Sequence, residues 1–284
     1  NKMSGVYDSS LIIDTQKFNK VIQKLRGFFL TKNFVEVHAQ NRLSILAACE
    51  DPFNLKTFDY AGKVWPLPQT SQMWLEYEIL KNPDVPGYFS VSTSYRSEPK
   101  PVPGRHDLIF PMFEFECKGD MDNLVALQKE LLVHLGYNSD NFYENDYTTI
   151  ADEFGVKELE HEHEERLYTE KSPVAFIKNF PEFTSPFWNM KRNTENNTGK
   201  KVDVILSGME TFGSAERECD VNIMRNRFET IMDGDYRRKL IELFGEERVE
   251  AELKEYFNLT FIPRVGTGIG VTRLIKSMEK EGLL

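Results

Sequence analysis

The sequence predicts a single α+β domain over residues 1–284, in which a mostly antiparallel sheet is flanked by helices. Strand-like segments are joined by hairpin-like loops, while helical segments gather before and after them. The chain has 284 residues, of which 40% are hydrophobic and 12% aromatic, so it can bury one large core. We find neither an internal repeat nor a break in composition that would divide it.

The first expected element is a long amphipathic helix over residues 15–32, capped by Asp14 or Thr15. A short strand over residues 34–37 should follow it. The apolar side chains that define the helix recur at helical spacing and are Phe18, Val21, Ile22, Leu25 and Phe29.

Two segments in the middle of the chain, 88–95 and 110–117, alternate apolar and polar residues in the manner of strands. The segment between them, 97–106, contains three prolines and a glycine and must be a loop. A helix over 124–135 that stops at Gly136 is expected next. Two buried strands, 174–177 and 202–206, should follow, with an exposed loop at 193–199 between them. The last expected elements are helices over 220–257, a glycine-spaced turn at 266–270 and a short helix to about residue 279.

Charge and composition exclude several classes of protein. A net charge of −10 and a pI near 5.2 weigh against a surface built for non-specific nucleic-acid binding, so any RNA contact must be local. The acidic runs at 158–165 and 246–255 are read as solvated helix faces. The apolar runs are far shorter than the roughly 20 residues of a membrane span, and the first ten residues lack a secretory signal. The cysteines, Cys49, Cys117 and Cys219, are odd in number and widely spaced, which argues against disulfides and favours the cytoplasm.

The strand over 110–117 is predicted to have one oily face and one acidic face. Because side chains alternate along a strand, Glu114 and Glu116 share a face with the aromatic Phe110, while Phe113, Phe115 and Cys117 take the other. Buried carboxylates without partners are costly, so the acidic face should meet a polar ligand or solvent. If the strand pairs with 88–95, cations from the loop converge on the same pocket, where they could bind phosphates; the alternative is an exposed charged hairpin. These cations are Arg96, Arg105 and His106.

Two further clusters suggest nucleotide chemistry. Asp203, Glu210 and Arg217 are spaced seven residues apart, and carboxylate oxygens suit magnesium, which takes one or two carboxylates together with substrate phosphates. The glycines of 266–270 allow close backbone approach, and Arg273 follows one helical turn later. The glycine spacing fits neither a Walker loop nor a Rossmann motif.

Taken in order, these clusters resemble the motifs of the class II aminoacyl-tRNA synthetases. Tyr95-Arg-Ser-Glu98 resembles the family's Phe-Arg-x-Glu, and Gly266 to Arg273 resembles its third motif, Gly-x-Gly-x-Gly-x-x-Arg. The resemblance implies the class II catalytic fold and ATP binding, with Arg96 and Arg273 as the catalytic residues. The ATP contacts that it implies are Arg96 at the α-phosphate, Glu98 at the adenine edge, Phe110 stacked on adenine, Arg105 and His106 at the outer phosphates, and Arg273 at the γ-phosphate.

Within class II, the stretches 162–167, 186–190 and 209–217 resemble the asparaginyl and aspartyl branch. This resemblance implies activation of asparagine or aspartate as an aminoacyl-adenylate, with ATP and Mg²⁺. The residue roles that it implies are Asp203 and Glu210 (also an ATP contact) as magnesium ligands, Arg217 facing the substrate side chain, Glu114 near the substrate ammonium, and Gln72 and Leu75 in the amino-acid pocket.

Leu75 stands where aspartyl enzymes, and the related archaeal asparagine synthetase, have a lysine. Loss of that cation favours a neutral amide, hence asparagine, unless Leu75 is simply a core residue. Two other readings stay open: an ammonia-dependent asparagine synthetase acting through aspartyl-adenylate, and a non-catalytic regulatory paralogue. The resemblance implies a homodimer, although segment 33–39 lacks the usual proline of the first motif. The length leaves no room for an anticodon-binding domain, so tRNA is one acceptor among several.

Overall fold

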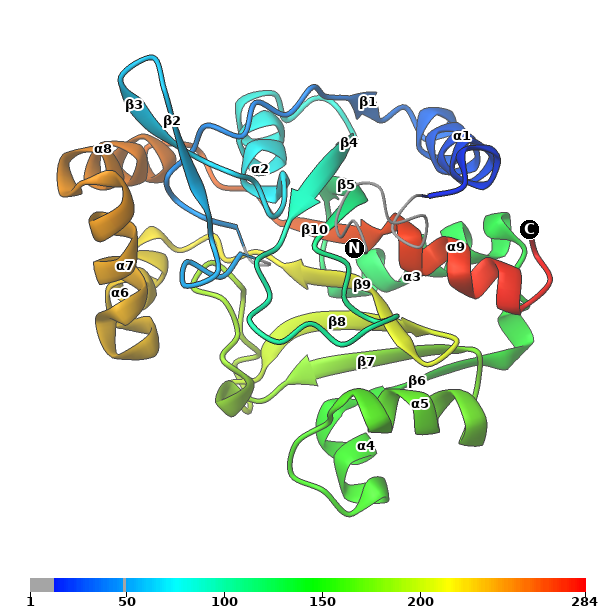
Figure 1. Cartoon of the computed structure of the whole chain (residues 1–284). Helices are drawn as coiled ribbons and strands as arrows, with labels where there is room; N and C mark the ends of the chain where they lie inside the picture. Colours follow the sequence, from blue (N-terminus) through cyan, green and yellow to red (C-terminus); the bar gives the residue numbers. More distant parts are fainter. Residues whose placement is uncertain (1–12, 48–49) are drawn as a thin grey trace, which may run out of the picture.

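The computed structural model describes residues 13–47 and 50–284 (Figure 1). Cys49 and the first ten residues, which bear on the cysteine and secretory-signal arguments, lie outside the described residues. Within the described ranges no helix is both long and apolar enough to cross a membrane.

One eight-stranded sheet organises the fold, with the strand order β1-β4-β5-β10-β9-β8-β7-β6. All neighbouring strands pair antiparallel except β1 with β4 and β6 with β7, which are parallel. The predicted fold class is therefore confirmed. The strands are β1 (Val35–Glu36), β4 (Gly87–Tyr95), β5 (Ile109–Lys118), β6 (Phe142–Asp146), β7 (Val174–Phe180), β8 (Gly199–Leu206), β9 (Met209–Glu216) and β10 (Arg264–Gly270), and a separate hairpin consists of β2 (Thr57–Tyr60) and β3 (Lys63–Pro66).

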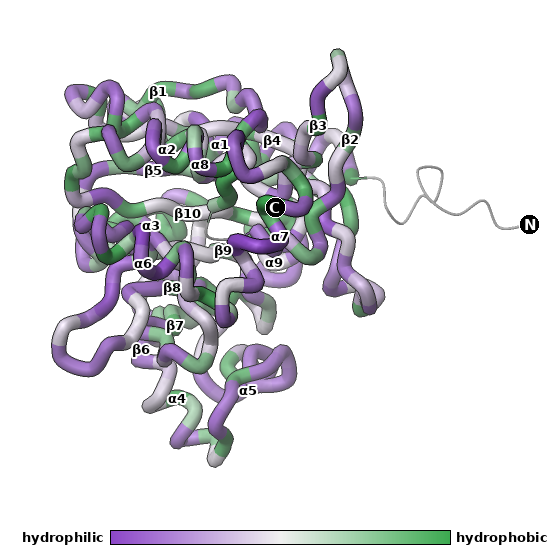
Figure 2. The backbone as a smooth tube through the Cα atoms, turned by 90° about the vertical axis from the view of Figure 1, so that its left-hand side faces the viewer, coloured by the Kyte–Doolittle hydropathy of each residue, from purple (hydrophilic) through white to green (hydrophobic). Residues whose placement is uncertain are grey.

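Helices cover both faces of the sheet. Figure 1 shows α1, α3 and α9 together on one side, and α2 with the α6, α7 and α8 group on the other. The helices are α1 (Thr15–Thr31), α2 (Gln72–Lys81), α3 (Met121–Leu135), α4 (Tyr147–Phe154), α5 (His161–Glu170), α6 (Val221–Thr230), α7 (Asp235–Phe244), α8 (Glu246–Phe257) and α9 (Val271–Lys280). Figure 2 shows that hydrophobic segments concentrate in the central strands, while α5 and α6 at the periphery are largely hydrophilic.

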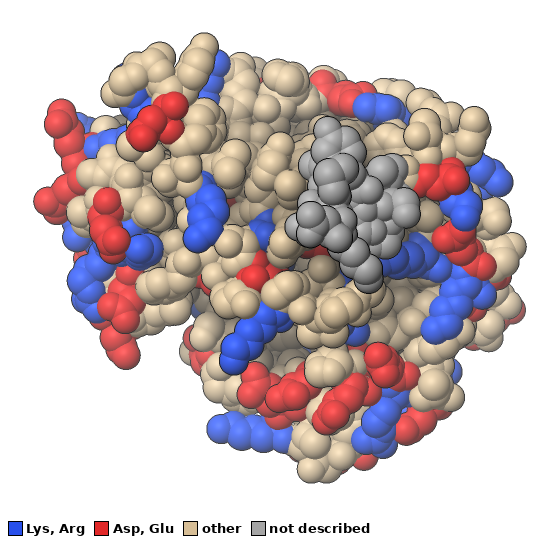
Figure 3. Space-filling model, viewed as in Figure 1, with Lys and Arg blue, Asp and Glu red and all other residues tan. Residues whose placement is uncertain are grey.

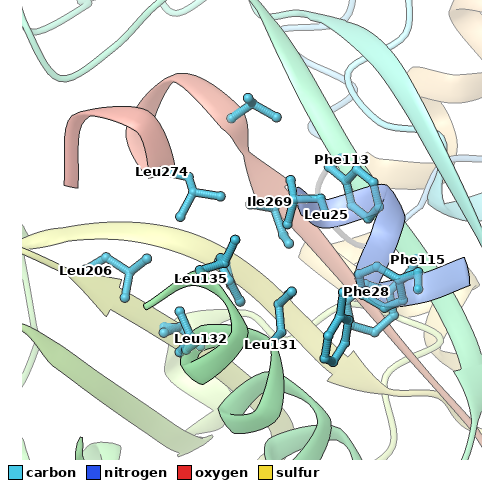
Figure 4. Close-up of a cluster of buried hydrophobic side chains, with 14 of the residues drawn as sticks. Leu25, Phe28, Phe113, Phe115, Leu131, Leu132, Leu135, Leu206, Ile269 and Leu274 are labelled. Atoms are coloured by element: carbon cyan, nitrogen blue, oxygen red, sulfur yellow. The ribbon is translucent and has the colours of Figure 1, made fainter. Parts of the chain in front are cut away.

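The first hydrophobic core lies between the sheet and the helices α1, α3 and α9. Phe113 and Phe115 of β5 pack there against Phe29 of α1, with ring centroids 5.3 and 4.7 Å away. Figure 4 shows side chains from α1, α3 and α9 converging in this layer with side chains from β5, β8 and β10. The predicted alternation of β5 is confirmed, because these phenylalanines face the core and the acidic residues face the opposite side.

The first helix illustrates how local sequence fixes an element. Asp14 is the N-cap of α1, and its carboxylate accepts a hydrogen bond from Lys17 N at 2.9 Å. The buried residues of the helix include Val21, Leu25 and Phe29, at the helical spacing that predicted it. At the other end of the core, Gly136 ends α3 in a left-handed conformation with φ of 109°.

The glycine-rich segment 266–270 differs from its prediction as a turn. It is part of β10, which pairs with β5 on one side and β9 on the other. Glycine is depleted in strands, so the pattern argues against one. Here the missing side chains are required, because a Cβ on Gly266 would lie 1.8 Å from Oε2 of Glu116.

Candidate active site

A pocket of about 390 Å³ opens at the ends of β4 and β5, where the loop over 96–108 meets α5 and the start of α9. Figure 3 shows that this face of the molecule carries both signs of charge, with acidic side chains gathered over α4 and α5. Seven of the residues predicted from the sequence line the pocket: Arg96, Glu98, Arg105, His106, Phe110, Glu210 and Arg273.

Three arginines supply the positive charge of the pocket. Arg273 is tied to two segments that are distant in sequence, because its Nη1 donates to Glu210 O at 2.6 Å and its Nη2 to Arg105 O at 2.9 Å. Arg105 itself forms an ion pair with Glu164 of α5. The buried Nε of Arg96 has no hydrogen-bond partner in the described part of the chain. An unpaired buried cationic donor is costly, so Arg96 is suited to bind an anion.

His106 is arranged as a neutral hydrogen-bond donor. Its Nδ1 accepts a hydrogen bond from Val102 N at 3.1 Å, which places the proton of the neutral ring on Nε2. Burial lowers the pKa of His106, although Glu98 opposes this shift, so the ring stays neutral at pH 7. A neutral imidazole can still donate Nε2–H to a phosphate oxygen.

The acids Asp203 and Glu210 approach the same side of β8 and β9. Asp203 pairs in register with Gly213, and Oε1 of Glu210 lies 3.4 Å from where a Cβ of Gly213 would stand. Burial raises the pKa of Asp203 to about 7, Lys201 opposes this, and Glu210 adds to it. Lys201 Nζ donates to Asp203 Oδ2 at 2.8 Å.

These two acids could hold a magnesium ion whose remaining ligands come from elsewhere. Oδ1 of Asp203 is buried and has no partner among the described residues, so one ligand oxygen is free. Glu210 lines the pocket that holds the arginines, whereas Asp203 is not one of its lining residues. Among the described residues, no group of three His, Cys, Asp or Glu side chains could hold a metal alone. This donor set matches the usual habit of Mg²⁺, which binds one or two carboxylates and keeps the rest for water and phosphate.

A cluster of buried polar side chains adjoins the pocket beside Gly268 and consists of Arg217, Glu116 and Gln72. We call this cluster the chamber, and it contains the predicted side-chain contact, Arg217. Arg217 Nε donates to Glu116 Oε1 at 3.1 Å, and its Nη2 donates to Glu116 Oε2 at 3.2 Å and to Gln72 Oε1 at 2.8 Å. Gln72 is fixed in turn, because its Nε2 donates to Thr267 O at 2.7 Å. Arg217 and Gln72 therefore lie together, and the sequence had not assigned Glu116 to this pair.

Glu114 lies beside this chamber and is completely buried. Its carboxylate accepts hydrogen bonds from the hydroxyl of Thr70, from Ser71 N at 2.7 Å and from the hydroxyl of Ser92 at 3.3 Å. A Cβ on Gly268 would lie 3.4 Å from Glu114 Oε1 and 3.0 Å from Cε of Met112, which lines the outer pocket. Gly268 thus separates the outer pocket from the chamber.

Glu50 is a candidate that the sequence did not single out. Its carboxylate accepts hydrogen bonds from Ala47 N at 3.0 Å and Gln69 N at 3.3 Å. Burial raises the pKa of Glu50 to about 7, and the charge of Glu114 contributes to the same shift. The residue lies in an irregular segment, where no periodic pattern marks it.

The placement of Leu75 corrects its assignment to the amino-acid pocket. Leu75 is completely buried in the second hydrophobic core, with Ile79, Trp188 and Tyr256. A side chain surrounded by apolar neighbours reports on packing and carries no information about an amide or a carboxylate. The preference for asparagine therefore loses the support of this residue.

One family of known proteins matches nearly the whole chain. The model of the family described as tRNA synthetases class II (D, K and N) matches residues 10–282. The chain belongs to this family, as the resemblance of its motifs predicted. Among individual proteins, an asparagine–tRNA ligase from Mycoplasma genitalium is 37% identical over 95 residues, which are 32% of this chain and 19% of that protein.

Solved structures share the fold. The asparaginyl-tRNA synthetase of Pyrococcus horikoshii complexed with asparaginyl-adenylate superposes with a TM-score of 0.75 at 20% identity, over 93% of this chain and 64% of that one. The corresponding complex of the Entamoeba histolytica enzyme gives 0.73 at 17% identity, over 94% and 63%. An aspartyl-tRNA synthetase from Entamoeba histolytica gives 0.68 at 16% identity, over 92% and 54%. The chain thus spans less than two thirds of the length of each.

Proposed function

We propose that the chain uses ATP and Mg²⁺ to activate the carboxylate of an amino acid, asparagine in preference to aspartate, as an aminoacyl-adenylate. The acyl group then passes to tRNA or to another acceptor. The observation that carries the proposal is the junction of two compartments at Gly268: an arginine-lined outer pocket and a buried chamber that holds Arg217 and Gln72. In this proposal ATP binds in the outer pocket, and the side chain of the amino acid binds beside Arg217 and Gln72.

The reaction needs charge stabilisation more than covalent help from the protein. A carboxylate oxygen of the amino acid attacks the α-phosphorus of ATP in line, the bond from that phosphorus to the bridging oxygen breaks, and pyrophosphate leaves with the electron pair. Arg96 stabilises the charge on the α-phosphoryl oxygens. Arg105, His106 and Arg273 bind the outer phosphates and so stabilise the leaving group. Mg²⁺ bound by Asp203 and Glu210 would supply Lewis-acid neutralisation of the phosphate charge.

The preference for asparagine rests on the charge of the chamber. Glu116 already occupies Arg217 through two hydrogen bonds in a site with almost no solvent contact. A substrate carboxylate would add a negative charge beside Glu116, which is unfavourable in a buried site. A neutral amide can accept a hydrogen bond from Arg217 without that cost.

A pyrophosphate-exchange assay over the twenty amino acids tests the proposal. We expect exchange with asparagine, and weaker exchange with aspartate. Exchange with aspartate alone, together with ammonia-dependent formation of asparagine, would assign the chain as an asparagine synthetase. Binding of ATP or an amino acid without any exchange would assign a regulatory paralogue. The homodimer, the cytoplasmic location and the use of tRNA stay predictions.

A further inference from the structure

A second ion pair lies directly behind the amino-acid chamber. Glu76 of α2 and Arg264 of β10 are both completely buried. Arg264 Nη2 and Nε donate to Glu76 Oε1 at 2.7 and 3.1 Å. The Tyr256 hydroxyl donates to the same oxygen at 3.1 Å, and Asn189 Nδ2 donates to the other carboxylate oxygen, Oε2, at 2.9 Å. The mechanism described above uses none of these four side chains.

The stability of the fold does not explain why Glu76 and Arg264 are buried as a charged pair. The cost of removing both ions from water is large, and apolar replacements of a buried ion pair are often equally stable. Buried charges of this kind have their best-attested roles in fixing a geometry or an electrostatic environment. The neighbours of the pair therefore decide what it does.

The Glu76–Arg264 pair is connected to the chamber through two elements. On α2, Gln72 and Glu76 are one helical turn apart and lie on the same face. On the other side, Arg217 N donates to Arg264 O at 2.9 Å, so the backbone of Arg217 is fixed by β10. A Cβ on Gly266, two residues after Arg264, would lie 2.5 Å from Arg217 Nη2 and 1.8 Å from Glu116 Oε2. The two ion pairs are therefore packed as one unit.

The two ion pairs contain charges of both signs, and these charges shift the pKa of Glu116 in opposite directions. Burial raises the pKa of Glu116 to about 7; Arg217 opposes that shift, Glu76 adds to it, and Arg264 opposes it. On the flanking strands, Glu116 pairs in register with Tyr88 of β4 and Gly266 of β10. Its neighbour Cys117 faces the opposite, apolar side of β5.

We infer that Glu76 and Arg264 are positioning residues of the amino-acid chamber, which hold Gln72 and Arg217 in place and set the charge of Glu116. Arg264 favours the ionised form of Glu116, and it is this ionised form that neutralises Arg217. The consequence for substrate choice rests on the proposed function, whereas the electrostatic coupling can be measured without any activity.

The test follows the Glu116 carboxyl directly by ¹³C NMR in protein labelled at the δ-carbon of glutamate. The Glu116 signal is assigned by its loss in Glu116→Gln. We expect Glu76→Gln to move the titration midpoint of Glu116 to lower pH and Arg264→Met to move it to higher pH. Each shift should be about one pH unit, a tenfold change in proton affinity. In the double variant the titration midpoint of Glu116 should return toward the wild-type value. In Arg264→Lys, which keeps the positive charge, the midpoint should be close to the wild-type value.

A role in packing alone would move both single variants in the same direction, or neither, and either result would overturn the inference. If Arg264→Met does not fold, Glu76→Gln decides, because an upward shift or no shift contradicts the coupling. Exchange kinetics provide the second readout: Glu76→Gln should change KM for asparagine at least threefold and leave KM for ATP unchanged. An absence of exchange in the wild type would refute the proposed function, while the NMR titration would still test the pair.

Discussion

Glu50 and Glu114 come from distant parts of the chain, yet their charges interact. Burial is the largest cause that raises the pKa of Glu50, and the backbone N–H groups of Ala47 and Gln69 oppose it. Two neighbouring carboxylates in a poorly solvated site favour the binding of a cation. The ammonium group of an amino acid is such a cation, so Glu50 joins Glu114 as a candidate for binding it.

This role predicts how the affinity for the amino acid depends on pH. Because the pKa of Glu50 is raised to about 7, its carboxyl is mostly protonated at pH 6 and mostly ionised at pH 8. Only the ionised form attracts an ammonium group, so KM for the amino acid should fall by roughly tenfold as the pH rises between these values. Exchange kinetics at several pH values measure this. Glu50→Gln should raise KM and flatten the profile, and an unchanged KM and profile in this variant would rule out the role.

At the scale of elements, the glycines of β10 allow side chains of neighbouring elements to lie directly against its backbone. Gly266 lies opposite Glu116 in the register of β5 and β10, and opposite Ala215 in that of β9 and β10. The space that its missing side chain leaves is occupied by Glu116, Arg217 and Gln72. The backbone of β10 therefore packs directly against the side chains of the chamber.

Gly266→Ala should damage the chamber without touching the outer pocket. A Cβ at this position would lie 1.8 Å from Glu116 Oε2 and 2.6 Å from Gln72 Oε1, so these buried groups must move. We expect a loss of amino-acid-dependent exchange of roughly 100-fold, comparable to losing one preorganised polar contact, with ATP affinity retained. The matched control is Gly27→Ala in α1, where nothing lies within 4 Å of the new methyl group. This control should keep full activity and gain about 0.5–1 kcal/mol of stability in thermal unfolding. Equal activity of the two variants would contradict the account.

Much of the fold could be predicted because periodicity reports directly on burial. The helix expected over 15–32 is α1, Thr15–Thr31, and the pairing of β4 with β5 places their side chains as expected. The strand β10 was mistaken for a turn because its glycines serve the site and not the sheet. The segment 142–170, which forms β6, α4 and α5, has weak local patterns and was not predicted in detail.

The candidate site could be predicted only where residues belong to a local motif. Arg96, Phe110 and Arg273 lie in such motifs, and the structure brings them to one pocket. Leu75 was assigned from a single position, although its burial depends on packing that no local pattern shows. Glu50 was missed because two of the groups that act on it, Gln69 and Glu114, lie about twenty and sixty positions away, and only the tertiary fold brings them together.

At the scale of the whole molecule, the proposed site has two parts, the outer pocket and the chamber, with separate tasks. In the outer pocket, Arg273 is held by backbone carbonyls and Arg105 by α5, whereas Arg217 is held by β5 and α2. The two sets share no hydrogen bond among the described contacts. Binding of the nucleotide and recognition of the amino acid should therefore be separable by mutation.

Two variants test this separation. Arg273→Ala should weaken ATP binding by roughly 100-fold, because a preorganised phosphate contact is lost. Arg217→Ala should abolish amino-acid-dependent exchange while ATP still binds. Calorimetric titration with ATP and exchange with asparagine measure the two effects. Arg225→Ala, which removes a half-exposed arginine of α6, is the matched control and should change neither. If both active-site variants lost ATP binding equally, the compartments would not be independent.

A crystal structure with a non-hydrolysable analogue of asparaginyl-adenylate tests the central claim most directly. The account predicts the adenine ring against Phe110, the phosphate equivalent at Arg96, and the amide side chain within hydrogen-bonding distance of Arg217. An analogue bound outside this pocket, or bound with its amide directed away from Arg217, would contradict it.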